Sequence, residues 1–226
     1  MSNLFREMII QRRLDHEKTL IFDEKYKIDT SNRIVKAYDD IGGFRPLEVF
    51  PQNFPRKYNG YMGVSLFELD IVYEILNRHF KNLEEYTFID IGSGKGKVIC
   101  FNIVNNIIYK KQIGIEYLED LANISKANIY NLSLNFNVEN INILNKDVFD
   151  YKFEDCNSIY FFFQTFSFES YKNFINKNKE TLLKNNNIIV NVCPYDEESG
   201  SFDHKGIFND FELVEKYEYI SIFKTF

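Results

Sequence analysis

The sequence contains no tryptophan, only four prolines and three cysteines, and no long apolar run. The cysteines Cys100, Cys156 and Cys193 are far apart and lie in apolar segments, so we expect reduced core residues, not a disulfide framework or a metal site. The longest apolar run, Ile159–Phe163, is far too short to span a bilayer. Residues 1–7 carry mixed charge without the apolar core of a signal peptide. We therefore expect a cytoplasmic protein with no membrane segment.

Positive charge is also scarce. The net charge is −6 and no basic run exceeds a few residues, which argues against a nucleic acid partner. Three histidines, His16, His79 and His204, are far apart, and only His204 could face an active site. Aromatic residues are abundant instead, with 23 Phe and 15 Tyr among 226 residues. This length suits one domain, or one domain with an extension, whose core and ligand pocket are rich in phenyl rings.

The order of expected elements indicates the fold class. Residues 1–64 combine helical spacing with an extended segment broken by Gly42, Gly43 and three prolines, and we expect them to form a cap. From residue 65 helical and strand patterns alternate. We expect helices over 65–80, 97–106, 119–130 and 170–183, and strands over 87–91, 112–116, 141–145, 158–163, 187–192, 211–216 and 219–224. Residues 65–226 are thus predicted to form a doubly wound α/β domain, mostly parallel, in which the final hairpin places one antiparallel strand.

The most informative motif is the run from Phe88 to Lys97, Phe-Ile-Asp-Ile-Gly-Ser-Gly-Lys-Gly-Lys. Glycines at every second position after an apolar strand let a nucleotide-like ligand approach the backbone. The dinucleotide fingerprint G-x-G-x-x-G does not fit, because the third glycine comes one residue early. A P-loop does not fit either, because the motif is one residue short and Val98 replaces the metal-binding hydroxyl. A glycine-rich turn without a ligand stays as the plain alternative.

The pattern Asp-x-Gly-x-Gly-x-Gly resembles the signature loop of the class I S-adenosylmethionine (SAM) methyltransferases. The resemblance covers roughly residues 58–195 and implies SAM as the cofactor and a seven-stranded sheet whose last strand is reversed. It places the loop residues around the cofactor, namely Asp90, Gly92, Ser93, Gly94 and Gly96. In this family the acid orients the loop or reaches the methionine amino group through water.

Two further strand ends complete the cofactor site that the resemblance implies. The strand 112–116 ends in Glu116, twenty residues after Gly96, where the family uses an acid to bind both ribose hydroxyls. Tyr117 follows and could pack on the adenine. After the strand 141–145, Asp147 would accept a hydrogen bond from the adenine amino group, and the N–H of Val148 would meet a ring nitrogen.

The acceptor end is expected at the turn after the strand 158–163. Many amino-group methyltransferases have an Asn there, followed by an aromatic residue, and Gln164 and Phe166 stand in their places. Small bacterial class I methyltransferases resemble the chain in an Asp-Thr pair, compare Asp29-Thr30. Non-SET, nucleosome-type lysine methyltransferases resemble it more distantly, and by that resemblance Tyr61 would lie over the methionine end of SAM.

These observations predict a SAM-dependent methyltransferase that acts on an O or N atom of a small molecule or a protein. A non-catalytic SAM-binding module and a protein-lysine methyltransferase are the alternatives, the first because Gln164 departs from the asparagine of the motif. No base stands out, although His204 and the acidic run 196–198 are candidates.

Overall fold

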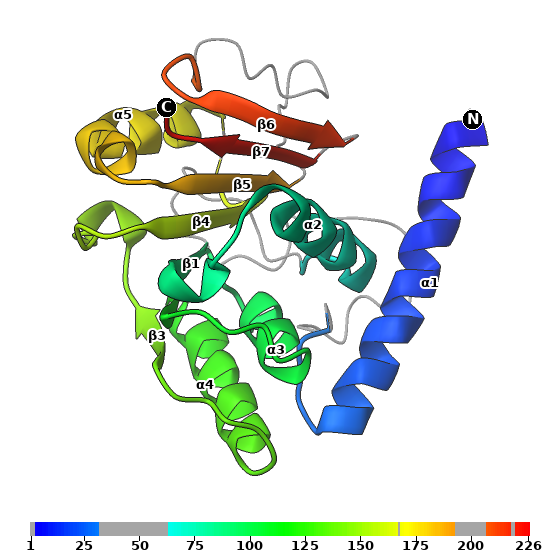
Figure 1. Ribbon diagram of the computed structural model, residues 1–226. Helices are drawn as coiled ribbons and strands as arrows, with labels where there is room; N and C mark the ends of the chain where they lie inside the picture. The colour runs from blue at the N-terminus through cyan, green and yellow to red at the C-terminus, as the bar shows by residue number, and fades with distance from the viewer. Residues whose placement is uncertain (1–2, 32–62, 167, 193–206, 218–219) are drawn as a thin grey trace.

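The computed structural model of the protein describes residues 3–31, 63–166, 168–192, 207–217 and 220–226. Within these ranges it forms a seven-stranded sheet with helices on both faces (Figure 1). The strands are β1 (Thr87–Ile91), β2 (Lys111–Glu116), β3 (Ile141–Asn145), β4 (Ser158–Phe163), β5 (Ile188–Val192), β6 (Glu212–Tyr217) and β7 (Ile220–Lys224). The helices are α1 (Asn3–Tyr26), α2 (Leu66–His79), α3 (Lys97–Val104), α4 (Glu119–Ser133) and α5 (Phe168–Lys184), with short 3-10 turns η2 (Leu83–Glu85) and η3 (Val148–Asp150).

The strand order is β3-β2-β1-β4-β5-β7-β6. The first five strands in this order run parallel, and β7 runs antiparallel to both β5 and β6. This confirms the predicted doubly wound sheet with a reversed last strand, and that strand lies inside the sheet, not at its edge. The chain moves in opposite directions from β1 and from β4, so the switch point where ligands bind lies at the carboxyl ends of these two strands.

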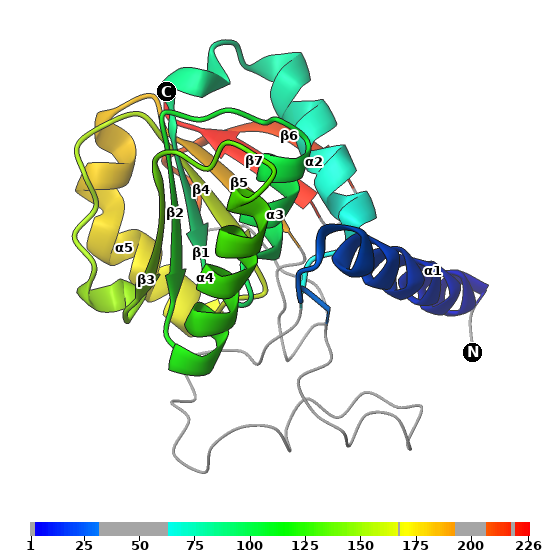
Figure 2. The same cartoon turned by 90° about the horizontal axis from the view of Figure 1, so that it is seen from below.

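Helices cover both faces of the sheet around β1, with α2, α3 and α4 on one side and α5 on the other (Figure 2). Phe88 and Phe161 pack in the cluster beneath α2 and α3, whereas Phe162 and Phe174 pack in the cluster beneath α5. All five residues of β1 are buried, because a parallel strand covered on both faces has no side exposed to water. The carboxyl end of β1 is therefore held by packing from both layers.

The N-terminal helix α1 is attached to the start of α2. Ser65 caps α2 in a capping box, in which its hydroxyl accepts from the N–H of Glu68 and its own N–H donates to the Glu68 carboxylate. The Asp15 side chain of α1 accepts a further hydrogen bond from the N–H of Leu66 at 2.9 Å. These caps satisfy N–H groups that the first turn of a helix leaves unpaired, and they connect α1 to the domain.

Several predicted features lie outside the described residues or are not decided by the fold. The extended segment around Gly42, Gly43 and the three prolines falls in residues 32–62. The boundary between a cap, 1–64, and a domain, 65–226, stays a prediction. In the described parts of the chain, no helix is long and apolar enough to cross a membrane.

Candidate functional site

The loop between β1 and α3 turns at three glycines. Gly92, Gly94 and Gly96 have φ angles of +73°, +53° and +77°, a conformation that L side chains rarely adopt. The backbone N–H groups of Gly92 and Ser93 both donate to the carbonyl of Ile115 in β2, at 2.9 and 3.0 Å. The loop therefore crosses from the end of β1 to the end of β2, over the edge of the sheet where ligands bind.

Two of these glycines are also required by close packing. A Cβ on Gly92 would lie 2.5 Å from Cγ2 of Thr165, in the turn after β4, and a Cβ on Gly96 would clash with Oγ of Ser125 in α4. The Thr165 hydroxyl donates to the carbonyl of Ile91 at 2.7 Å. The glycine loop is thus fixed against both neighbouring elements. Sequence reasoning missed Thr165, since a threonine in an aromatic turn carries no distinguishing pattern.

Glu116, at the end of β2, is bound to the glycine loop. Its Oε2 accepts from the N–H of Gly94 and its Oε1 accepts from the N–H of Leu118, each at 2.8 Å. The residue is 7% exposed; burial raises the pKa of its carboxyl, and backbone hydrogen bonds from Leu118, Gly94 and Tyr117 oppose the rise. Because a carboxylate offers about four lone pairs, these bonds leave some acceptor capacity for a ligand.

Asp90 lies inside the site, at the end of β1. Its side chain is buried, and Oδ2 has no hydrogen bond partner among the described residues. Burial, together with the nearby Glu116 carboxylate, raises the pKa of Asp90 from 3.8 to about 8. A buried acceptor without a donor is unfavourable. A positively charged ligand at this point would therefore be matched by two buried carboxyl groups.

The Ser93 side chain is buried against β2. A Cβ on Gly114 of β2 would lie 2.9 Å from the Ser93 hydroxyl, which places this hydroxyl over the middle of β2. The oxygen is buried and, within the described ranges, has no hydrogen bond partner. Its predicted contact with the cofactor stays a prediction.

The carboxyl end of β3 is joined by hydrogen bonds to the end of β2. The side-chain amide of Asn145 donates to the carbonyls of Glu116 and Tyr117, at 3.1 and 2.9 Å. Tyr117 is 42% exposed, so its ring is accessible to a ligand at this edge. The ends of β2 and β3 thereby keep a fixed separation, as a ligand that contacts both of them requires.

Asp147 caps the turn η3 immediately after β3. Its carboxylate accepts from the N–H of Phe149 at 2.9 Å, and the side chain is half-buried. Val148 is buried in the cluster beneath α5. The contacts of Asp147 and Val148 with an adenine stay predictions, and both residues stand at the same edge of the sheet as Glu116.

The predicted acceptor turn has one unusual backbone conformation. Gln164 has a φ of +46°, although a residue with a Cβ is strained there. Phe166 is 4% exposed, and its ring packs against Phe149 and Phe174 in the core. The roles of Gln164 and Phe166 toward an acceptor stay predictions. Strained residues that their surroundings hold in place are concentrated at functional sites.

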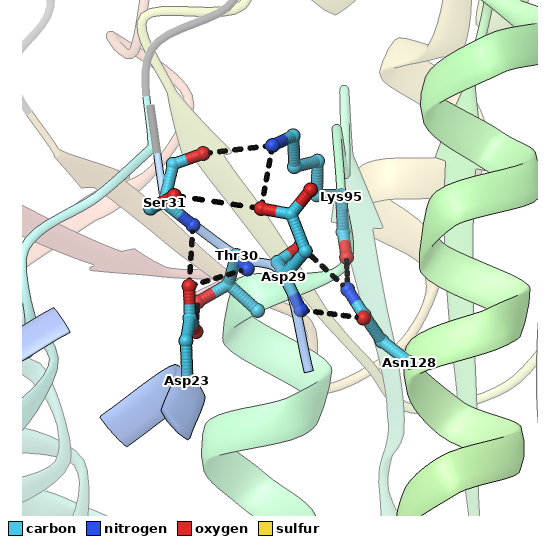
Figure 3. A network of polar contacts seen from close by, with 6 residues as sticks. All are labelled: Asp23, Asp29, Thr30, Ser31, Lys95 and Asn128. Atoms are coloured by element: carbon cyan, nitrogen blue, oxygen red, sulfur yellow. Dashed lines mark hydrogen bonds and ion pairs between the residues drawn. The ribbon is translucent and has the colours of Figure 1, made fainter. Parts of the chain in front are cut away.

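The two lysines of the motif contact the N-terminal segment, residues 15–31. The Lys95 ammonium donates to Asp29 (Figure 3), and the Lys97 ammonium donates to the hydroxyl of Thr19 at 2.8 Å. Sequence reasoning did not assign these lysines a role. Two features of the sequence could have indicated these contacts: the lysines alternate with glycines in the motif, and aspartates are present at 15, 23 and 29.

Three groups of candidates lie outside the described residues: Tyr61, His204 and the acidic run 196–198. In the part of the chain that the structure describes, no group of three or more His, Cys, Asp or Glu side chains is placed to hold a metal ion.

Neither a family model nor a curated protein sequence matches the chain. Solved structures do match. A protein of the NADB-Rossmann superfamily from Streptococcus agalactiae has 15% identity over 73% of this chain and 69% of that chain, with a TM-score of 0.49. Magnesium protoporphyrin IX methyltransferase from Synechocystis, with bound S-adenosylhomocysteine (SAH), has 14% identity over 73% and 88%, with a TM-score of 0.49. A ribosomal protein methylase from Lactobacillus delbrueckii has 11% identity over 70% and 76%, with a TM-score of 0.46.

Proposed function

We propose that the protein is a SAM-dependent methyltransferase. The observation that carries the proposal is the pair of buried carboxyl groups at the switch point of the sheet. Asp90 has an oxygen without a described partner, and Glu116 is held by the glycine loop with acceptor capacity to spare. A ligand that fits this pair carries a positive charge and a diol, and SAM has both: an ammonium group with a sulfonium, and the ribose hydroxyls.

The residues of this chain then have separate tasks. Glu116 accepts hydrogen bonds from the ribose hydroxyls with the acceptor capacity that remains on its carboxylate. Asp147 accepts from the adenine amino group, the N–H of Val148 donates to a ring nitrogen, and Tyr117 packs on the adenine. Asp90 orients the loop, and a bound ammonium group lowers the pKa of its carboxyl so that the carboxylate balances the positive charge. Gly94 presents backbone without a side chain to the ligand.

The acceptor is expected beside this cofactor, at the turn that follows β4. Thr165 fixes this turn against the glycine loop through its contact with Gly92 and its hydrogen bond to Ile91. Gln164 would hold an acceptor O or N atom of a small molecule or a protein with its side-chain amide. When bound, SAM supplies a methyl group on a sulfonium sulfur, which leaves readily. The protein's part is to align the acceptor, and such alignment can contribute about 7–11 kcal/mol.

A non-catalytic SAM-binding module is the second candidate, and Phe166 favours it. In the family motif the aromatic residue holds the acceptor, whereas the ring of Phe166 packs in the core, 4% exposed. A protein-lysine methyltransferase is the third candidate, and it rests on the sequence resemblance at Tyr61 and in the Gln164–Phe168 segment.

Transfer of a tritiated methyl group from SAM into a cell extract tests the proposal. We expect label in one fraction after the extract is separated into small molecules, protein and RNA. Protease and ribonuclease treatment then identify the class of acceptor, and acid hydrolysis of labelled protein detects methyl-lysine. At a SAM concentration near the wild-type Kd, Glu116→Ala should reduce the labelling about tenfold or more, whereas Glu119→Ala, an exposed neighbour in α4, should retain it. Absence of label in every fraction from a protein that binds SAM would support the non-catalytic module.

A further inference from the structure

A lysine in the middle of the glycine loop joins this loop to the N-terminal segment. The Lys95 ammonium lies 2.7 Å from Oδ1 of Asp29 and donates to the carbonyl of Ser31 at 3.0 Å (Figure 3). These partners are 66 and 64 residues away in sequence. The contact therefore connects two segments that share no secondary structure element.

The burial of this lysine is unusual. Its side chain is 1% exposed, whereas that of Asp29 is 52% exposed. An ammonium group is rarely buried so fully unless it has partners, because leaving water is unfavourable for a charge. The N-terminal segment holds the Lys95 side chain in the interior, away from solvent.

Asn128 of α4 holds the same two segments through backbone groups. Its amide nitrogen donates to the carbonyls of Asp29 and Lys95, at 2.8 and 2.9 Å, and its amide oxygen accepts from the N–H of Asp29 at 2.8 Å. Asn128 is 3% exposed. One side chain thus fixes the peptide of Lys95 and the backbone of residue 29 at the same point.

The N-terminal segment is itself held in one conformation by Asp23. The Asp23 carboxylate accepts from the N–H groups of Thr30 and Ser31, each at 2.8 Å, and from the Thr30 hydroxyl at 2.6 Å. Lys97, the second lysine of the motif, also joins the glycine loop to the N-terminal segment, because its ammonium donates to the Thr19 hydroxyl at 2.8 Å. Burial lowers the pKa of Lys97, and the carboxylates of Asp15, Asp23 and Glu68 oppose this effect.

We propose that Lys95 and Asn128 are positioning residues that clasp residues 28–31 to the glycine loop and so hold the loop in its cofactor-binding conformation. The clasp acts through the loop backbone. The side chain of Lys95 is held by Asp29 and Ser31, and its carbonyl is held by Asn128. The preceding residue, Gly94, donates its N–H to Glu116. Loss of the Lys95 contacts would therefore affect Gly94, the adjacent residue, and through its hydrogen bond would affect Glu116, which is proposed to bind the ribose.

The effect on cofactor affinity rests on the proposed function, but the clasp itself does not. Hydrogen exchange of backbone amides in the unliganded protein tests the clasp alone. In Lys95→Met we expect exchange to be about tenfold faster in both the N-terminal segment, 15–31, and the loop, 92–97, with no change in β4 and β5. The matched control is Lys111→Met, which breaks the Lys111–Glu154 ion pair at the opposite end of β2. Unchanged exchange in either of the two segments would overturn the clasp.

Titration with SAH by calorimetry tests the consequence. We expect the Kd of Lys95→Met to rise about tenfold or more, as for the loss of a charged hydrogen bond, and that of Lys111→Met to change less than about twofold. Asp29→Asn keeps the acceptor oxygen without its charge and should weaken binding less than Lys95→Met, and it decides the matter if Lys95→Met does not fold. An affinity equal to that of the wild type in Lys95→Met or, where that variant does not fold, in Asp29→Asn would overturn the positioning role. If the wild-type protein does not bind SAH, the proposed function fails, and hydrogen exchange still decides the clasp.

Discussion

The carboxylate of Glu116 accepts a hydrogen bond from the backbone N–H of Gly94 at 2.8 Å, which connects the end of β2 to the loop that follows β1. The same side chain accepts from Leu118 at 2.8 Å, in the residues that lead into α4. Glu116 thus keeps one rotamer without a ligand. A preorganised carboxylate need not be ordered on binding, which favours affinity.

Substitution of Glu116 tests its binding role. Glu116→Ala should weaken SAH binding by about 1.5–3 kcal/mol, because hydrogen bonds to a charged group are lost. Calorimetric titration measures the change, and Glu119→Ala, exposed in the first turn of α4, is the control. Equal affinities of the Glu116→Ala variant and the wild type would remove Glu116 from the site.

Asp90 gives the unliganded protein a characteristic pH dependence. The pKa of Asp90 is about 8 in the folded protein against 3.8 for an ordinary aspartate. The folded state therefore holds a proton that the unfolded state has released between these values. The contribution of Asp90 to the free energy of unfolding should be most favourable below pH ~4, fall as the pH rises to ~8, and level off above, a loss on the order of 5 kcal/mol.

Urea denaturation between pH 5 and pH 9 measures this dependence. Asp90→Asn carries no titrating group, so its stability advantage over the wild type should grow as the pH rises from 5 to about 8. Burial also raises the pKa of Glu116, which contributes a slope of the same sign to both proteins, so the difference between them reports Asp90. Parallel stability curves for the two proteins would contradict the burial of an unpaired carboxyl at this position.

A pair of substitutions tests the contact between the glycine loop and the acceptor turn. Gly92→Ala combines the strain of a positive φ, about 1–2 kcal/mol, with the contact between the new Cβ and Cγ2 of Thr165. Thr165→Ser removes that methyl group and keeps the hydroxyl that donates to Ile91. In a double-mutant cycle by urea denaturation, Thr165→Ser should restore about 1 kcal/mol to Gly92→Ala. Simple additivity would show that the two segments are not in contact.

Substitution of Gln164 by glycine should raise the stability of the protein and lower its activity. Gln164→Gly relieves a left-handed backbone, so we expect a gain of about 0.5–1 kcal/mol, together with loss of methyl transfer because the amide is removed. Asn82→Gly is the matched control, since Asn82 has a φ of +56° and caps η2, remote from the loop. Asn82→Gly should raise stability by a similar amount and leave methyl transfer unchanged. Full methyl transfer by Gln164→Gly would exclude the amide from the acceptor site.

The sequence was sufficient to predict the sheet. The strands 87–91, 141–145 and 158–163 have the predicted bounds, because apolar residues between polar turns specify strands, which are buried in the two central cases and half-buried at the edge. Helix ends were less accurate. The helix expected to reach Asn106 ends at Val104, since Asn106 adopts a φ of +55° that a helix cannot contain.

The long-range contacts could not be predicted from local patterns. The pairing of Lys95 with Asp29 depends on how α1 packs, and a lysine between glycines is equally compatible with a solvated side chain. The conformation of Gln164 is also set by tertiary contacts, because the neighbouring Thr165 is anchored to β1. The candidate cofactor residues could be proposed from the sequence because each follows a strand at a fixed position in the fold, and their contacts with a cofactor stay predictions. The clasp has no such local pattern.

The most direct test of the central claim is calorimetric titration of the purified protein with SAM and with SAH. The account predicts that both bind with a Kd well below about 1 mM, and that Glu116→Ala weakens both. ATP shares the adenosine but lacks the ammonium group that Asp90 would balance, and it should bind far more weakly. If neither SAM nor SAH binds below about 1 mM to the protein with Glu116 intact, the assignment of the cofactor, and with it the proposed function, is wrong.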